Sequence, residues 1–295
     1  MAQSDPVVLQ GPITGVRRLR AGTTYVVASE VRVQKGGRLV VEDGVNILIL
    51  NGVLPSSSIA HAALIFDQGS VLQAKRLYVR ACDDRFRVVK AADNGGLWFF
   101  GGYRSAEKDG LSVTADRPSA ASSFRADLIA VYYLGHGDPV RQSRDPLQDD
   151  RDGLSIMGVG PQEWDVTELR SFHSGDDGID LTNSHIAVQR LRVVAPAEDG
   201  INLSSSMLQV ARSLKVDVTM TDVSDRDIFD LETDDGPSYV EIARHCHVDI
   251  VGVFGDDLSL RSPDMPEADH TRDISYRFKG FLRLSPALVL SLNED

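Results

Sequence analysis

The sequence predicts an all-β solenoid, in which the strands of successive coils stack into parallel sheets. Three observations lead to this prediction: a motif that recurs every 22 to 29 residues, alternation of apolar and polar residues within each copy, and no helical pattern between copies. The chain has 295 residues, of which 42% are hydrophobic, so it can bury a sizeable core. We expect a single domain over 1–295, with a cap at 1–20, coils at 21–262, and a C-terminal loop and cap at 263–295.

The recurring motif is an acidic residue or pair followed by a short strand. Its copies RDGLSIMG, DDGIDLTN, EDGINLSS, RDIFDLET and GDDLSLRS begin at Arg151, Asp176, Glu198, Arg226 and Gly255. KDGLSVTA at Lys108 and ADLIAVYY at Ala126 extend the series toward the N-terminus. Period-two alternation places Ile179 and Leu181 on one face, which is typical of a half-buried strand.

A second strand follows the first inside most copies. Aligning ELRSF, RLRVV, SLKVD and HCHVD places on the inner side Leu169, Leu191, Leu214 and Cys246. The outer side then carries a column of cations, Arg170, Arg192, Lys215 and His247. An anionic polymer can follow such a column, but flanking acids such as Glu168 and Asp217 are alternative partners for the same cations. The chain has two cysteines, Cys82 and Cys246, which we expect to be separate core thiols.

Three stretches together carry a family resemblance: GGRLVVEDGVNILI, NGGLWFFGG and the SGDDGIDL, EDGINL series. They resemble the pectin-lyase-like superfamily over roughly residues 20 to 262. The resemblance implies a single right-handed parallel β-helix with capped ends. Within that superfamily, SGDDGIDL is similar to the paired-aspartate motif of polygalacturonases, whose acids perform inverting glycoside hydrolysis. The chain departs from that family because its Gly-His-Gly at 135–137 precedes the aspartates, and only Arg261 or the RFK at Arg277 matches the later basic motif.

Acidic residues on the strands are the catalytic candidates. If Ile179 and Leu181 point inward, the outward column reads Ser155, Asp180, Asn202, Asp230 and Ser259. Asp180 and Asp230 are then two coils, roughly 9 to 10 Å, apart, near the upper end of the separation of about 6.5 to 9.5 Å used by inverting glycosidases. The predicted catalytic residues are Asp180, Asp230, Asp176, Asp177 and Arg261. The alternative is that aspartates before a glycine are corner residues that hydrogen-bond to backbone.

Neighbouring polar residues are predicted to bind substrate or metal. The predicted substrate-binding residues are Asn202, Glu232, Arg192, Lys215 and His136. His136 belongs to a polar loop at 132–152 and is a candidate general acid or base, or only a loop histidine. Clustered acids repel one another unless a cation holds them, so Ca²⁺ is a candidate cofactor at Asp234 and Asp235. Trp98 and Phe100 are expected in the core rather than on a sugar.

Charge and composition limit the partners. Forty-three acidic against 31 basic residues give a net charge of −12, which argues against sequence-independent nucleic-acid binding. No signal-like or membrane-spanning stretch occurs, so the chain as written is expected to be cytoplasmic, or secreted if a signal peptide was removed. We expect a carbohydrate-active enzyme, a hydrolase or lyase acting on a polysaccharide or oligosaccharide. The alternative is a non-catalytic scaffold that binds glycans or proteins, and the tail 281–295 is expected to form a cap or a homo-oligomer contact.

Overall fold

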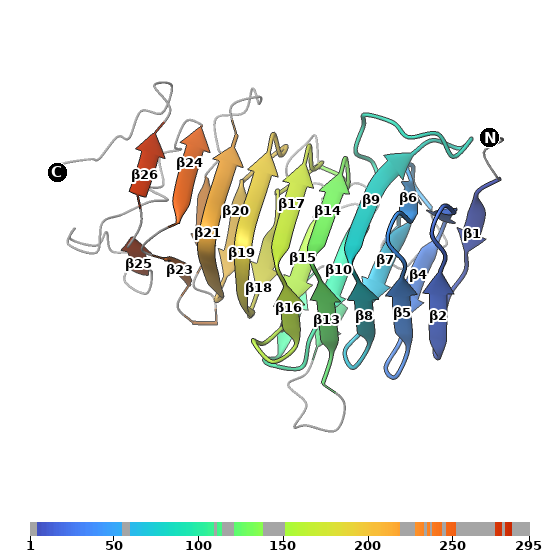
Figure 1. Ribbon diagram of the computed structural model, residues 1–295, viewed down its shortest axis with the longest axis horizontal. Helices are drawn as coiled ribbons and strands as arrows, with labels where there is room; N and C mark the ends of the chain where they lie inside the picture. The colour runs from blue at the N-terminus through green and yellow to red at the C-terminus, as the bar shows by residue number, and fades with distance from the viewer. Residues whose placement is uncertain are drawn as a thin grey trace.

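A computed structural model describes residues 5–54, 60–108, 111–113, 121–137, 151–218, 228–232, 235–236, 238–243, 246–251, 275–278 and 281–284. These residues form an all-β structure of parallel sheets, consistent with the predicted solenoid. Figure 1 shows the strands side by side along the long axis, with β1 at one end and β26 at the other. Within the described ranges, no helix is long and apolar enough to cross a membrane.

Sheet A is the largest sheet, with twelve strands among the described residues. Its strands are β1 (Val7–Leu9), β3 (Thr24–Val27), β6 (Asn46–Leu50), β9 (Arg76–Cys82), β14 (Leu128–Tyr132), β17 (Glu168–Phe172), β19 (His185–Val194), β21 (Met207–Asp217), β23 (Tyr239–Ile242), β24 (His247–Val251), β25 (Ser275–Phe278) and β26 (Phe281–Leu284). Both β23 and β24 pair with the long strand β21, so the sheet divides into two paths at its C-terminal end.

Two smaller parallel sheets and one hairpin complete the described structure. Sheet B contains β4 (Glu30–Val33), β7 (Ala63–Phe66), β10 (Gly96–Phe100), β15 (Leu154–Met157), β18 (Asp180–Thr182), β20 (Ile201–Ser204) and β22 (Phe229–Glu232). Sheet C contains β2 (Val16–Leu19), β5 (Arg38–Val41), β8 (Val71–Ala74), β13 (Ser123–Ala126) and β16 (Trp164–Val166). The antiparallel hairpin is β11 (Ala106–Lys108) with β12 (Leu111–Val113).

The predicted register of sheet B is confirmed. Asp180 pairs with Asn202, and Leu181 pairs with Leu203, in neighbouring parallel strands. The next strand continues the same alignment through Asp230. The inward residues belong to one central core to which all three sheets contribute, and the Leu169, Leu191, Leu214 stack of sheet A joins the same core. Period-two alternation therefore identified the buried face of both sheets correctly.

The alignment of sheet A was wrong in its last coil. Leu214 pairs with Val248, not Cys246, and Lys215 pairs with Asp249, not His247. A shift of two residues leaves every side chain on its predicted face, so the hydrophobic pattern cannot detect it. Cys246 and Cys82 are buried free thiols, as expected, and burial raises the pKa of each to about 11.

The N-terminal extension of the motif series was also wrong. The copy at Lys108 contributes β12 to the hairpin, and the copy at Ala126 contributes β14 to sheet A, whereas the motif strands lie in sheet B. The strand of sheet B that precedes β15 is β10, within NGGLWFFGG. Its Trp98 and Phe100 are buried, but in a separate apolar cluster with Ala63, Ile65 and Met157, outside the central core.

Close packing explains why glycine occupies positions 178 and 200 of the recurring motif. A Cβ atom at Gly178 would collide with the Val193 side chain and with the carbonyl of Gly200. A Cβ atom at Gly200 would lie 2.7 Å from the carbonyl oxygen of Ile228 and from Val216. Glycine is required here because neighbouring strand ends approach closely, which is one of its two ordinary uses.

The two predicted caps have different outcomes. Residues 5–20 of the expected N-terminal cap supply β1, which pairs with β3 in sheet A, and β2, which pairs with β5 in sheet C. The predicted C-terminal cap contributes β25 and β26, which continue sheet A, and the rest of 263–295 lies outside the described residues. Leu258 and Leu260, predicted to be in the core, also lie outside them.

Candidate functional site

The predicted column of sheet B forms, but its central carboxylate is not exposed. Ser155, Asp180, Asn202 and Asp230 occupy one row across four neighbouring strands. Asp180 has 0% exposed surface, so the expectation that it faces solvent was wrong. The Ser155 hydroxyl lies 3.1 Å from a carboxylate oxygen of Asp180 and 3.1 Å from one of Asp152, and it can donate its single hydrogen to only one of them at a time.

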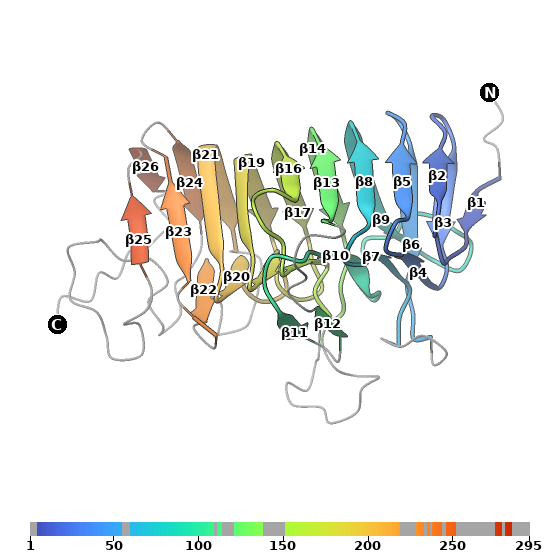
Figure 2. The same ribbon diagram turned by 90° about the horizontal axis from the view of Figure 1, so that it is seen from below.

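Arg104 and Ser105 contact the ends of two strands of sheet B, one of which is β18, the strand of Asp180. Figure 2 shows the β11–β12 hairpin beside sheet B. The Asn183 amide donates to the carbonyl of Ser105 at 2.9 Å, and the Arg104 guanidinium donates to the carbonyl of Ser205 at 3.2 Å. These contacts attach Arg104 and Ser105 to the ends of β18 and β20.

The remaining residues of the predicted sheet B site become more exposed toward the C-terminal end. Asn202 and Asp230 are half-buried, and Glu232 is exposed. Asp235 accepts a hydrogen bond from the Asn183 amide at 2.8 Å, which gives it a structural role. Asp234 and Arg261 lie outside the described residues, so their predicted metal-binding and catalytic roles stay predictions.

The paired aspartates lie at the corner where the chain enters sheet B. Asp152, Asp176 and Asp177 are all buried, and one carboxylate oxygen from each lies within 4.8 Å of the others. Asp177 accepts a hydrogen bond from the backbone N–H of Asp199 at 3.0 Å, as expected of a corner residue, and its catalytic role stays a prediction. Such a set of oxygen atoms is the kind that hard cations bind, at a place other than the predicted pair Asp234 and Asp235.

His136, predicted to bind substrate, lies in a cluster that spacing along the sequence did not indicate. Its Nδ1 is 3.0 Å from Oδ1 of Asp93, and Nε2 of His61 is 3.6 Å from the same oxygen. The two imidazole centroids are 4.6 Å apart. His61 and Asp93 were missed because 32 and 43 residues separate the three positions, and no short motif spans such intervals.

The predicted cationic column on sheet A forms but is mostly paired with acids. Arg170, Arg192 and Lys215 stack in register. Glu168 accepts hydrogen bonds from Arg170 and Arg190, and Lys215 pairs with Asp249 at 3.0 Å. Burial alone would raise the pKa of Glu168, but these hydrogen bonds outweigh it and hold the pKa below its ordinary value. Arg192 lies over the Phe172 ring, 5.1 Å from its centroid.

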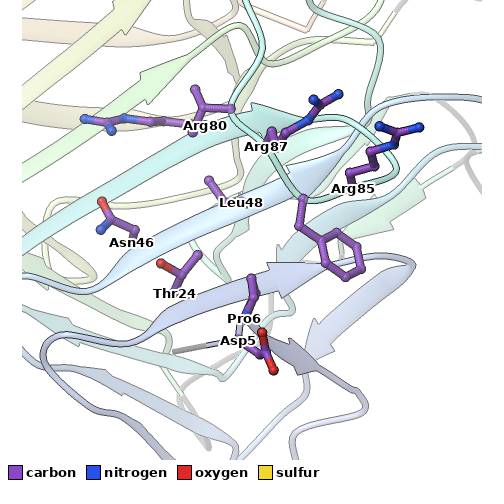
Figure 3. Close-up of a pocket in the computed structure, with 10 residues that line it drawn as sticks. Asp5, Pro6, Thr24, Asn46, Leu48, Arg80, Arg85 and Arg87 are labelled. Carbon is purple, nitrogen blue, oxygen red and sulfur yellow. The ribbon is translucent and has the colours of Figure 1, made fainter. Parts of the chain in front are cut away.

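An open cleft of about 490 Å³ lies on the outer face of sheet A near its N-terminal end. Figure 3 shows Arg80, Arg85 and Arg87 along one side and Asp5 with Pro6 along the other. The remaining lining residues are Thr24, Asn46, Leu48, Phe86 and Val88. Leu48 belongs to a small apolar patch against which Phe86 packs, so the cleft combines an apolar floor with a cationic rim.

A tight turn presents the arginine side of the cleft. Asp83 accepts backbone hydrogen bonds from Arg85 at 3.0 Å and Arg87 at 2.9 Å. Nε and Nη2 of Arg87 both donate to Oδ2 of Asp83 as well, at 2.8 and 2.6 Å. The Arg87 side-chain hydrogen bonds and the backbone N–H groups lower the pKa of Asp83 below its ordinary value. The turn is therefore held by the ionised carboxylate.

Two of the cleft arginines have no acidic partner among the described residues and can therefore bind an anionic ligand. Arg80 lies over the Tyr132 ring, 5.2 Å from its centroid, and Arg85 is exposed. Neither side chain forms an ion pair in the part of the chain that the structure describes. Planar guanidinium groups that are not engaged by acids are suited to carboxylate, sulfate or phosphate groups.

Comparison with protein-family models, curated proteins and solved structures gives no match for this chain.

Proposed function

We propose that this chain is a carbohydrate-active β-helix protein that binds an acidic polysaccharide or oligosaccharide in the arginine cleft and cleaves or modifies it. The observation that carries the proposal is the cleft itself, with Arg80 and Arg85 on its rim. Arginine side chains without acidic partners favour a carboxylate-bearing or sulfated sugar over a neutral one.

The other lining groups support a sugar rather than a simple anion. Asn46 and Thr24 offer an amide and a hydroxyl group, which can exchange hydrogen bonds with sugar hydroxyl groups. Phe86, which is half-buried, and Val88, which is exposed, offer apolar surface for the C–H face of a pyranose ring. A cleft of about 490 Å³ is large enough for a ligand of roughly two sugar rings, given that ligand pockets span about 300 to 1,000 Å³.

The finer fold assignment is part of the same proposal. The sequence resemblance favours a single right-handed parallel β-helix of the pectin-lyase-like superfamily. The parallel sheets and their strand order support a solenoid of this kind. A crystal structure of the full chain tests the assignment, since a left-handed coil or a break between two separate domains would contradict it.

A non-catalytic glycan-binding or assembly scaffold is the second candidate, and one observation favours it. Asp180, the best catalytic candidate from the sequence, is fully buried and lies beside Ser155. A carboxylate without access to solvent cannot reach a polysaccharide unless the surrounding structure moves. Asp180 and Asp230 also lie in sheet B, whereas the arginine cleft lies on sheet A, so a role for them in cleavage requires that the substrate also reach sheet B. In that case Asp180→Asn and Asp230→Asn each lower turnover by about 100-fold or more, as for loss of a general acid or base.

A glycan panel separates these candidates. Binding is measured by calorimetry for oligosaccharides matched in length and linkage that are uronic, sulfated or neutral, and cleavage is followed by the release of new chain ends. The proposal expects binding of an acidic member with at least about tenfold preference over its neutral match, the equivalent of about 1.4 kcal/mol. Binding without cleavage supports the scaffold. Equal binding of neutral and acidic members contradicts the role of the arginines.

A further inference from the structure

His61, Asp93 and His136 form a compact cluster of two imidazoles and one carboxylate. One ligand atom from each residue lies within 4.8 Å of the others. In a four-coordinate zinc site with bonds of about 2.0 to 2.1 Å, neighbouring ligand atoms are about 3.3 Å apart. The two measured separations from Oδ1 of Asp93, 3.0 Å and 3.6 Å, lie on either side of that value.

Backbone hydrogen bonds hold the three residues in place. His136 exchanges two backbone hydrogen bonds with Arg151, at 2.8 and 2.6 Å, and the carbonyl of Asp93 accepts one from Gly52 at 2.7 Å. His61 lies in an antiparallel bridge with Val53. The set is therefore largely pre-formed, which lowers the ordering cost of binding an ion.

Asn94 connects the cluster to the coils around it. Its side chain is fully buried and hydrogen-bonds to Asn51, to the carbonyl of Tyr133 and to the backbone N–H groups of Gly96 and Gly135. These contacts link the residue after Asp93 to the residue before His136. They fix the backbone next to two of the three candidate ligands.

The three side chains differ in how much of each is exposed to solvent. The His61 side chain is 1% exposed, that of His136 is 19% exposed and that of Asp93 is 43% exposed. An ion held by all three would have protein on the His61 side and solvent on the Asp93 side. Sites with three protein ligands and one open position are the kind that activate a water molecule or polarise a substrate group, whereas structural zinc sites are closed by a fourth protein ligand.

We propose that His61, Asp93 and His136 bind one divalent transition-metal ion, with Zn²⁺ as the best-suited ion. Two imidazole nitrogens favour Zn²⁺, Fe²⁺, Co²⁺ or Ni²⁺ over Ca²⁺ and Mg²⁺, which take oxygen ligands. The two neutral imidazoles and one carboxylate leave a net charge of +1 on the occupied site, so it attracts an anionic or strongly polar fourth ligand. The site does not depend on the proposed glycan function.

Cobalt titration tests the site directly. The full chain is stripped with chelator, and Co²⁺ is added without any glycan while visible absorption is recorded, followed by displacement with Zn²⁺. The proposal expects one ion per chain, absorption bands of a four- or five-coordinate site, and loss of these bands on adding Zn²⁺. Asp93→Asn and His136→Gln should each weaken Co²⁺ binding at least about tenfold, and His185→Ala, a histidine outside the cluster, should bind as the wild type does.

The partly exposed ligands keep the test decisive. His61→Ala removes a buried side chain and can unfold the chain, so the conclusion rests on Asp93→Asn and His136→Gln, with thermal melts of the metal-free proteins as a folding control. Absence of stoichiometric Co²⁺ uptake by the wild type overturns the proposal, and so does unchanged binding in both variants. In either case the conclusion is a His–Asp–His cluster that holds no metal ion.

Discussion

Two groups of cations on the outer face of sheet A have opposite surroundings. Toward the C-terminal end, Arg170 and Arg190 both donate to Glu168, and Lys215 pairs with Asp249. Near the N-terminal end, Arg80 and Arg85 line a cleft and form no ion pair among the described residues. The same sheet therefore carries neutralised cations in one region and available ones in another.

This difference shows what decides whether a cation can bind an external anion. Arg80 projects from the same face of sheet A as the paired cations, and Arg85 lies in the turn that follows the Arg80 strand. Position on the sheet alone therefore does not distinguish the two regions. The neutralised cations have an acid on the same strand or the next one, within reach of a long side chain. Arg80 instead faces an aromatic ring, and Asp83 beside Arg85 is already engaged by Arg87.

The largest effect is expected on removing the shared acid of the paired region. Glu168→Ala leaves Arg170 and Arg190 without their carboxylate, and Glu168 is largely buried. The free energy of unfolding should fall by about 1 to 3 kcal/mol. Denaturant unfolding measures this loss, with the exposed Asp165→Ala on β16 as a control that should change stability by about 0.5 kcal/mol at most. Equal losses in the two variants would show that the Glu168 pairs contribute nothing specific.

A second, milder substitution at Glu168 should leave Arg170 and Arg190 free to bind an external anion. Glu168→Gln removes the charge that neutralises Arg170 and Arg190 but keeps the size of the side chain. Affinity for the acidic glycan should then rise about twofold to fivefold, since exposed ion pairs are worth about 0.2 to 1 kcal/mol. Calorimetric titration of the two proteins in one buffer measures the gain. An unchanged affinity would show that a glycan bound in the cleft does not extend along sheet A to these strands.

A small effect is expected at the exposed pair. Lys215 and Asp249 are each about one-third exposed in their ion pair at 3.0 Å. Lys215→Ala should lower the free energy of unfolding by about 0.2 to 1 kcal/mol, and about 1 M salt should remove most of that difference by screening. A loss that does not respond to salt would instead indicate that packing of the lysine methylene groups is responsible.

The smallest effect is expected on the stability of the turn at 83–87, which forms one side of the cleft. The pKa of Asp83 is lowered in the folded chain, so its stabilising contribution is complete above the ordinary carboxyl pKa and is lost as the pH falls through the lowered value. Melting temperatures from about pH 6 to about pH 3 should therefore fall slightly more for the wild type than for Asp83→Asn. Parallel curves would mean that the ionised Asp83 does not stabilise the turn.

The sequence predicted the inward and outward faces of the strands, because a half-buried strand must alternate at period two. It also predicted the register of β18, β20 and β22, where each copy keeps one apolar and acidic pattern. The register of β24 was wrong because a shift of two preserves that pattern. The burial of Asp180 was not predicted, since period-two alternation assigns a side chain to the outer face of a strand but does not indicate what packs against that face.

Sequence patterns did not predict most residues of the candidate sites. Asp5, Asn46, Arg80 and Arg85 meet in the cleft through folding, and His61, Asp93 and His136 meet at one corner in the same way. One local signal was available for the cleft, the DDRFR stretch at 83–87, which places two arginines around a phenylalanine in a turn. The proposed metal-binding cluster of His61, Asp93 and His136 had no such signal, because its residues lie far apart in the sequence and share no motif.

The most direct measurement compares the two cation groups in one binding experiment. An acidic oligosaccharide identified by the panel is titrated into the wild type, into Arg80→Ala/Arg85→Ala and into Arg170→Ala/Arg190→Ala, which removes the two arginines that pair with Glu168. The cleft variant should bind about 100-fold more weakly or worse, because each lost guanidinium–anion contact is worth about 1.5 to 3 kcal/mol, while the second variant should lose about threefold at most, as expected for cations already paired at the surface. Equal losses, or a larger loss in Arg170→Ala/Arg190→Ala, would contradict the account.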